Sequence, residues 1–141
     1  MPMFRFSEVA RLMAVSDDTV RRWVDNGRLS SALDAAGRKV VDGADLAKFA
    51  KSQARSMADP SGIARSARNQ FVGLVTEVTA DTVMAQVEMQ CGPYRVVSLM
   101  SAEAVAELGL APGVLAVAVV KSTSVVIEVA DVVGQADELP A

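Results

Sequence analysis

The chain has 141 residues, 51% of them apolar, and a formal net charge of −3. It contains one cysteine and no histidine, so an internal disulfide is excluded and the commonest general base and transition-metal ligand is missing. It also has no apolar run long enough to cross a bilayer and no pattern of a secretion signal. We therefore expect a cytoplasmic protein that has no contact with a membrane and is not an enzyme.

The charge is distributed unevenly along the chain. Residues 1–70 contain 12 Lys and Arg against 8 Asp and Glu, for a net charge of +4. Residues 71–141 contain 2 against 9, for a net charge of −7. A basic half joined to an acidic half indicates that only the first half meets a polyanion.

The first fifty residues have the spacing of helices. Ser7, Ser16 and Asp42 are the expected N-caps of three helices, which end near residues 13, 26 and 51. Between the second and third helices, a turn at Asp34–Gly37 separates two short extended pieces. Two helices, a hairpin and a third helix follow one another in the order of a winged helix-turn-helix.

The second half of the chain has the period of strands. Residues 52–65 lose their periodicity and are expected to hold the end of a helix followed by a linker. Five expected strands follow, with one short helix at 101–108 between the third and the fourth: residues 70–78, 83–90, 94–100, 114–120 and 125–129. This order predicts a five-stranded OB-like β-barrel. The fold class is therefore α+β with two domains, divided into 1–52, a linker at 53–65, a barrel at 66–133 and an acidic tail at 134–141.

The helical half resembles a known group of DNA-binding domains. The stretch SEVARLMAVSDDTVRRWVDNGRL is similar to the MerR and excisionase-like families over residues 4–51. The resemblance implies binding to double-stranded DNA, with the second helix in the major groove and the wing on phosphates. On this reading the DNA-binding residues are Thr19, Arg21 and Arg22 of the helix and Arg38 and Lys39 of the wing.

Two observations support a different reading of the helical half. Asp17, Asp18 and Asp25 lie near the expected DNA face and would repel phosphate. The hairpin is also rich in alanine and leucine. On this alternative reading, Arg21 and Arg22 are ordinary charged residues on a solvated face. The domain would then bind protein instead of DNA.

Two groups of hydrogen-bond donors lie at the ends of expected barrel strands. Ser66 and Arg68 are two residues apart, so in an extended segment their side chains point the same way. Lys121 and three hydroxyl residues, 122–124, follow the expected fourth strand. A hydroxyl, an ammonium and a guanidinium suit an anion rich in oxygen acceptors.

This half resembles the Mop domains, the molybdate- and tungstate-binding OB-like modules of molbindins. The resemblance rests on SARNQFVGLVTEV, MSAEAVAELGLAPG and VVKSTSVVIE, taken in order. It implies a homo-oligomer, a dimer or hexamer, that holds molybdate or tungstate between subunits without a free metal cation. The implied oxyanion ligands are Ser66, the backbone of Ala67, Arg68, Ser101, Lys121 and Ser122. Relatives often have threonine at the position of Ser101 and serine at the position of Ala104.

Together the two resemblances predict an oxyanion-responsive transcriptional regulator. One alternative is an intracellular molybdate or tungstate store whose helical part organises the oligomer. Another is an architectural DNA binder whose barrel only oligomerises. Binding of single-stranded nucleic acid by the barrel is disfavoured because Phe71 and Tyr94 are its only aromatic residues.

Overall fold

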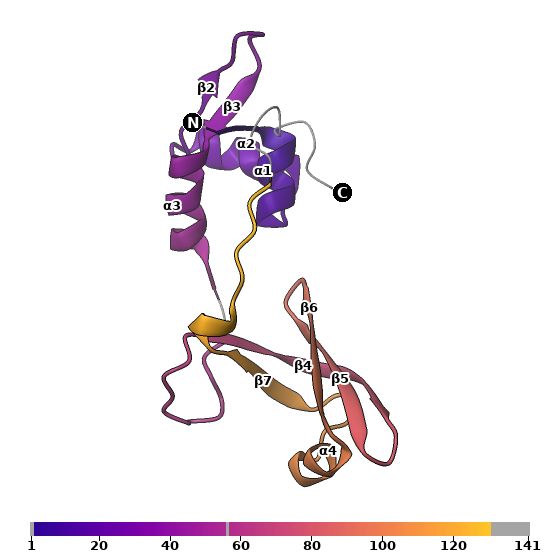
Figure 1. The fold of residues 1–141 in the computed structure, drawn as a ribbon. Coiled ribbons are helices and arrows are strands. Elements are labelled where there is room, and N and C mark those ends of the chain that lie inside the picture. The colour runs from indigo at the N-terminus through magenta and orange to yellow at the C-terminus, as the bar shows by residue number, and fades with distance from the viewer. Residues whose placement is uncertain (1, 56, 131–141) are drawn as a thin grey trace. The chain divides into compact units, whose positions relative to one another are not determined.

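The fold is described by a computed structural model for residues 2–55 and 57–130. The chain divides into two compact units, of which the first contains Met1–Arg55 and the second is Ser56–Ile127 (Figure 1). Within the described ranges, no helix has the length and apolar character needed to cross a membrane.

The first unit combines three helices with a small antiparallel sheet. The helices are α1 (Phe6–Met13), α2 (Asp17–Asp25) and α3 (Gly43–Gln53). The strands are β1 (Met3–Arg5), β2 (Ala32–Leu33) and β3 (Lys39–Asp42), in the order β1-β3-β2. The two short extended pieces predicted on either side of the Asp34–Gly37 turn therefore form the β2–β3 hairpin, and β1 is an element that the sequence reading did not include.

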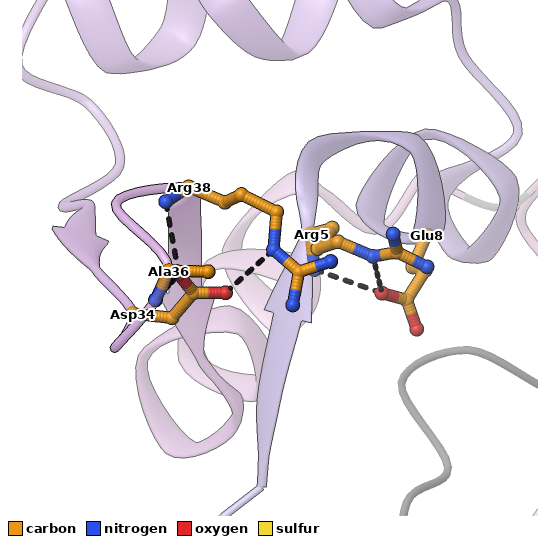
Figure 2. Close-up of polar contacts among 5 residues, drawn as sticks. All are labelled: Arg5, Glu8, Asp34, Ala36 and Arg38. Carbon is orange, nitrogen blue, oxygen red and sulfur yellow. Dashed lines mark hydrogen bonds and ion pairs between the residues drawn. The ribbon is translucent and has the colours of Figure 1, made fainter.

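Local hydrogen bonds explain where these helices begin. Ser16 accepts from the Thr19 amide and Asp42 accepts from the Asp45 amide, which confirms both as N-caps. The expected cap Ser7 is wrong, because α1 begins one residue before it, with Arg5 as N-cap. The Glu8 carboxylate accepts from the Arg5 amide at 3.0 Å, and this bond closes the first turn (Figure 2).

The core of this unit lies between the helices and β3. Trp23 meets Phe49 edge to face, with ring centroids 4.8 Å apart, and the Arg28 guanidinium lies 5.8 Å from the Phe49 centroid. The buried apolar cluster contains Val9, Ala10, Val20, Leu29, Val41, Leu46 and Phe49. The inward stripe of α2 is thus packed, so its remaining faces carry the charged residues.

The second unit is an antiparallel sheet with the strand order β6-β5-β4-β7. Its strands are β4 (Asn69–Ala80), β5 (Met84–Cys91), β6 (Tyr94–Ser101) and β7 (Leu115–Val120). The helix α4 (Ala102–Leu108) lies between β6 and β7, and the 3₁₀ turn η1 (Ser122–Ser124) follows β7. Ser101 caps α4 by accepting from the Ala104 amide, and Gly109 ends it in the left-handed conformation, so the helix lies where the sequence predicts one.

Two predictions for this unit are wrong. Residues 125–129 do not form a fifth strand of the sheet, because they pair with no strand in the described part of the chain. The strand expected at 83–90 stops too early, because Cys91 is the last residue of β5, where it is buried and burial raises the pKa of its thiol. The predicted acidic tail at 134–141 lies outside the described residues.

The centre of the sheet depends on a close approach at Gly73. A Cβ at this position of β4 would lie 2.2 Å from the Gln90 carbonyl oxygen and 2.7 Å from the Cys91 sulfur, both on β5. Backbone cannot give way to a methyl group as a flexible side chain can, so only glycine fits here without distortion.

We therefore predict that Gly73→Ala destabilises the second unit by about 2 kcal/mol or more, because the methyl group forces β4 and β5 apart. Chemical denaturation followed by circular dichroism measures the change. Thr79→Ala, at an exposed position of the same strand, is the control and should change stability little. Equal stability of both variants would contradict the close approach.

Candidate oxyanion site and nucleic-acid interface

The pairing of β4 with β7 brings the two predicted donor groups together. Asn69 is the partner of Val120 in the antiparallel register, so Arg68 and Lys121 occupy the next positions at the same end of the sheet. The Asn69 side-chain amide donates to the Val120 carbonyl at 3.1 Å and fixes this end. The two clusters, predicted from separate parts of the sequence, are therefore neighbours within one chain.

Nearby bonds shape the backbone around the first cluster. The Gln70 side-chain amide donates to the carbonyl of Ala67 at 3.3 Å, and Ala67 itself is buried. Ser66 and Arg68 on either side of Ala67 are exposed. On the other strand, the Ser124 amide donates to the Lys121 carbonyl at 2.9 Å and closes η1. Hydrogen bonds therefore fix the backbone of both clusters, while their polar side chains are exposed to solvent.

The basic residues of this unit fall into two kinds. Arg65 forms an ion pair with Asp59 at 3.0 Å, and Arg95 forms one with Glu88 at 2.9 Å. The Arg95 bond lowers the pKa of the Glu88 carboxyl. Across residues 2–55 and 57–130, by contrast, no carboxylate pairs with Arg68 or Lys121. Two cations at neighbouring positions, neither paired with a carboxylate, are the kind of groups that bind an anion.

Ser101 lies away from this site in the same chain. It pairs with Met84 at the start of β5, and β5 begins beside the end of β4 rather than beside Asn69. Since β4 has 12 residues, about 3.3 Å of strand per residue separates the two ends by roughly 35 Å or somewhat less. The structure therefore brings Ser66, Ala67, Arg68, Lys121 and Ser122 to one end and leaves Ser101 at the other.

One residue near the site was missed by the sequence reading. Asn69 was taken only as part of the SARN pattern, whereas its side chain ties β4 to the last residue of β7. A polar residue at the first position of a strand was the available signal. Its partner 51 positions later was not predictable from local pattern.

The predicted DNA-binding residues of the first unit differ in how their side chains are engaged. The Arg21 guanidinium pairs with Asp18 at 3.1 Å, and the Arg38 guanidinium pairs with Asp34 at 2.9 Å (Figure 2). The Thr19 hydroxyl lies 3.0 Å from that of Ser16. In the part of the chain that the structure describes, Arg22 and Lys39 have no carboxylate partner. Neutralised arginines reduce the positive charge that this surface offers to phosphate.

Comparison with known proteins identifies both units. Residues 3–54 match the helix-turn-helix domain family, and residues 65–127 match the TOBE domain family. MopII from Clostridium pasteurianum is 39% identical over 47% of this chain and 100% of its own, with a TM-score of 0.44. The chain belongs to the Mop family, with a helix-turn-helix domain fused to its TOBE domain.

Two further solved structures match the TOBE domain. A molybdate-binding protein from Sporomusa ovata is 32% identical over 47% of this chain and 98% of its own, with a TM-score of 0.45. The cytoplasmic molybdate-binding protein ModG, solved with molybdate bound, is 42% identical over 47% of this chain and 48% of its own, with a TM-score of 0.42. None of the curated proteins matches the chain significantly.

The β2–β3 hairpin of the helix-turn-helix domain depends on one carboxylate. Asp34 accepts from the amides of Arg38 and Ala36, both at 2.9 Å, and from the Arg38 guanidinium (Figure 2). The Arg38 amide, the Arg38 side chain and the Ala36 amide together lower the pKa of Asp34 below 3.8. A depressed pKa means that the stabilisation is present above the ordinary value and is lost as the pH falls through the lower folded value.

We predict that the amide resonances of Ala36 and Arg38 titrate with a midpoint below pH 3.8, the ordinary value for aspartate. Two-dimensional NMR during acid titration measures the midpoint. Asp34→Asn is the control, because it should remove this titration. A midpoint at or above 3.8 in the unsubstituted protein would show that Asp34 does not hold the hairpin.

Proposed function

We propose that this chain is an oxyanion-responsive DNA-binding regulator. Its TOBE domain binds molybdate or tungstate, and its helix-turn-helix domain binds double-stranded DNA. The observation that supports the first part is the neighbouring position of Arg68 and Lys121, the basic residues of the barrel unit that have no carboxylate partner among the described residues. The molybdate-binding relatives, 32–42% identical, support the choice of ligand.

The chemistry of the site suits a tetrahedral dianion. Molybdate and tungstate present only acceptor oxygens. Each hydrogen bond that they receive from water must therefore be replaced by one from a protein donor. Arg68 supplies a planar fork of N–H groups, Lys121 an ammonium, and Ser66 and Ser122 hydroxyls. Two formal positive charges balance the dianion, and the size of the cavity would distinguish it from sulfate.

The position of Ser101 bears on how many subunits form the site. Its hydroxyl caps α4 at the far end of the sheet and cannot reach Arg68 of the same chain. Ser101 contributes to the anion site only if a second subunit places this end of its sheet against Arg68. The proposed ligand therefore lies between subunits.

We expect Arg68→Ala and Lys121→Ala each to weaken molybdate and tungstate binding at least tenfold, because a charge-assisted hydrogen bond is worth about 1.5–3 kcal/mol. Isothermal titration with molybdate, tungstate and sulfate measures the change. Arg95→Ala is the matched control, since Arg95 is already paired with Glu88. Equal losses of affinity in all three variants would indicate a general charge effect and would rule out a specific anion site at Arg68 and Lys121.

The second part of the proposal rests on the helix-turn-helix domain and its exposed cations. Arg22 and Lys39 are exposed and free of carboxylates among the described residues, whereas Arg21 and Arg38 are paired. These pairs also favour a second candidate function, in which the chain stores oxyanion and its helical domain does not bind DNA. Binding to mixed-sequence duplex DNA that weakens with salt separates the two functions.

For the regulator, we predict that Asp18→Asn strengthens binding to mixed-sequence DNA roughly two- to fivefold more than Asp25→Asn does, by fluorescence anisotropy at low salt. Both variants remove one negative charge from the end or face of α2, but only Asp18 pairs with Arg21. An equal effect would mean that the Arg21–Asp18 pair does not control the charge offered to DNA.

The regulatory step itself is tested by adding the anion. DNA affinity of the full chain is measured with and without saturating molybdate, with sulfate at the same ionic strength as the control. A regulator changes its affinity with molybdate alone. Unchanged affinity would leave a DNA-binding or a storage protein and would remove the regulatory role.

A further inference from the structure

The charges of the helix-turn-helix domain are divided unevenly between α2 and α3. α2 carries three aspartates against two arginines, so its net charge is −1. α3 carries two lysines against one aspartate, so its net charge is +1, and Arg28 in the loop after α2 adds another positive charge. The helix expected in the major groove therefore has the same sign of charge as phosphate, whereas α3 and Arg28 have the opposite sign.

The cations Arg28, Lys48 and Lys51 are exposed and are not neutralised locally. In the ranges 2–55 and 57–130, no carboxylate forms an ion pair with any of the three. This includes Asp45, which stands one turn before Lys48 on the same helix. One arginine of α2 and one of the β2–β3 hairpin, in contrast, already form ion pairs with aspartates. α3 and the loop after α2 therefore keep their positive charge for an anionic partner.

Aromatic packing holds Arg28 against α3. Its guanidinium lies 5.8 Å from the centroid of the Phe49 ring, and that ring is packed edge to face against Trp23. A hollow of about 310 Å³ joins the loop to the helix. It is lined by Arg28, Leu29 and Ser30 of the loop and by Asp45, Lys48, Phe49 and Ser52 of α3. Arg28 and Lys48, which are distant in sequence, therefore border one surface.

Lys48 and Lys51 lie on the side of α3 that is turned away from the core. They are three residues apart and so share a face, whereas Leu46 and Phe49 are buried on the other side. An exposed alanine precedes each lysine by one turn, at positions 44 and 47. Because helical side chains lean toward the N-terminal turn, both lysines extend over a short side chain that leaves room for a bulky partner.

The charges around the hollow favour an extended polyanion over a small oxyanion. Asp45 lines the hollow together with the cations, so a small dianion inside it would meet a carboxylate. A phosphate backbone that lies across the cations need not enter the hollow, and duplex DNA offers one negative charge for about every 1.7 Å of its axis. The match of this unit to the helix-turn-helix family favours duplex DNA over an acidic protein.

We propose that Arg28, Lys48 and Lys51, the α3 face, hold the phosphate backbone of duplex DNA and supply more of the electrostatic attraction than α2 does. The inference rests on the DNA binding proposed above, to which it adds a second contact face. Phosphate contacts position a protein on DNA without reading its sequence, and each one releases a counterion. The negatively charged α2 is then left to contact base edges, while the α3 face supplies affinity.

The first experiment measures how the DNA affinity of the full chain depends on salt, by fluorescence anisotropy with a mixed-sequence duplex. We expect the double variant Lys48→Ala/Lys51→Ala to lower the slope of log K against log salt by about 1.8, since each phosphate contact contributes about 0.9. Arg28→Gln should lower it by about 0.9. Arg21→Ala/Arg22→Ala removes the same charge from α2 and should lower the slope less. Alanine favours helix, so both double variants should stay folded, which circular dichroism checks.

Three results of this experiment would overturn the α3 face. Without salt-dependent DNA binding by the unsubstituted chain, the DNA-binding part of the proposed function fails as well. Normal binding with an unchanged slope for Lys48→Ala/Lys51→Ala would remove the α3 face alone and leave the proposed function standing. Tighter binding to polyglutamate than to a duplex of equal charge, lost in the same variant, would assign this face to an acidic protein.

A second experiment locates the contact without any substitution. The lysines of the chain are Lys39, Lys48, Lys51 and Lys121. Each is acetylated with an N-hydroxysuccinimide ester in the presence and absence of duplex DNA, and peptide mass spectrometry measures the rate at each position. We expect severalfold slower acetylation of Lys48 and Lys51 in the complex and an unchanged rate at Lys121, which belongs to the other unit. Unchanged rates at Lys48 and Lys51 in a complex that does form would overturn the proposal.

Discussion

The pairing of β4 with β7 ends at Asn69 and Val120, and this end point decides which polar groups become neighbours in the TOBE domain. The residues that follow the ladder on the two strands, Arg68 and Lys121, are both cationic. A shift of the register by one residue would turn the side chains of one strand to the opposite face. The Asn69 amide, bonded to the Val120 carbonyl, holds the register where the two positive charges are adjacent.

Two adjacent cations repel each other, and the acidic remainder of the domain does not neutralise them locally. Arg65 and Arg95, in contrast, have their own carboxylates. A dianion bound at the end of the β4–β7 ladder would be attracted by both cations. By linkage, a ligand that binds only the folded state stabilises it, so the anion would tighten the same ladder that forms its site.

The sequence predicted most of the fold because most of its signals are local. The caps at Ser16 and Asp42, the turn at Asp34 and the left-handed Gly109 depend on neighbours within four residues. Ser7 failed as a cap because α1 already begins at Phe6, where the Glu8 carboxylate closes the first turn on the Arg5 amide. The strand expected at Val125–Val129 failed for a different reason: alternation shows that a segment suits a sheet, but not which sheet it joins.

The same limit applies to the candidate site. The SARN segment and the Lys121–Ser122 segment could each be read as donors, yet only the β4–β7 register places them together. Ser101 entered the predicted site through the family resemblance alone, and the register of β5 with β6 puts it at the other end of the sheet. What the residue types indicated was the chemistry of the site. The number of chains needed to build it depended on pairing between strands far apart in sequence.

This separation has a consequence for how the two domains would act together. If one chain supplies Arg68 and Lys121 and another supplies Ser101, anion binding and subunit association share a coupling free energy, and each strengthens the other. A second helix-turn-helix domain then accompanies every site, and two such domains bind DNA well only when their spacing matches two half-sites. The anion would influence DNA binding through the number and arrangement of chains rather than by reaching α2 directly. Such a mechanism requires no rigid contact between the domains, because assembly alone brings the second DNA-binding domain to the complex.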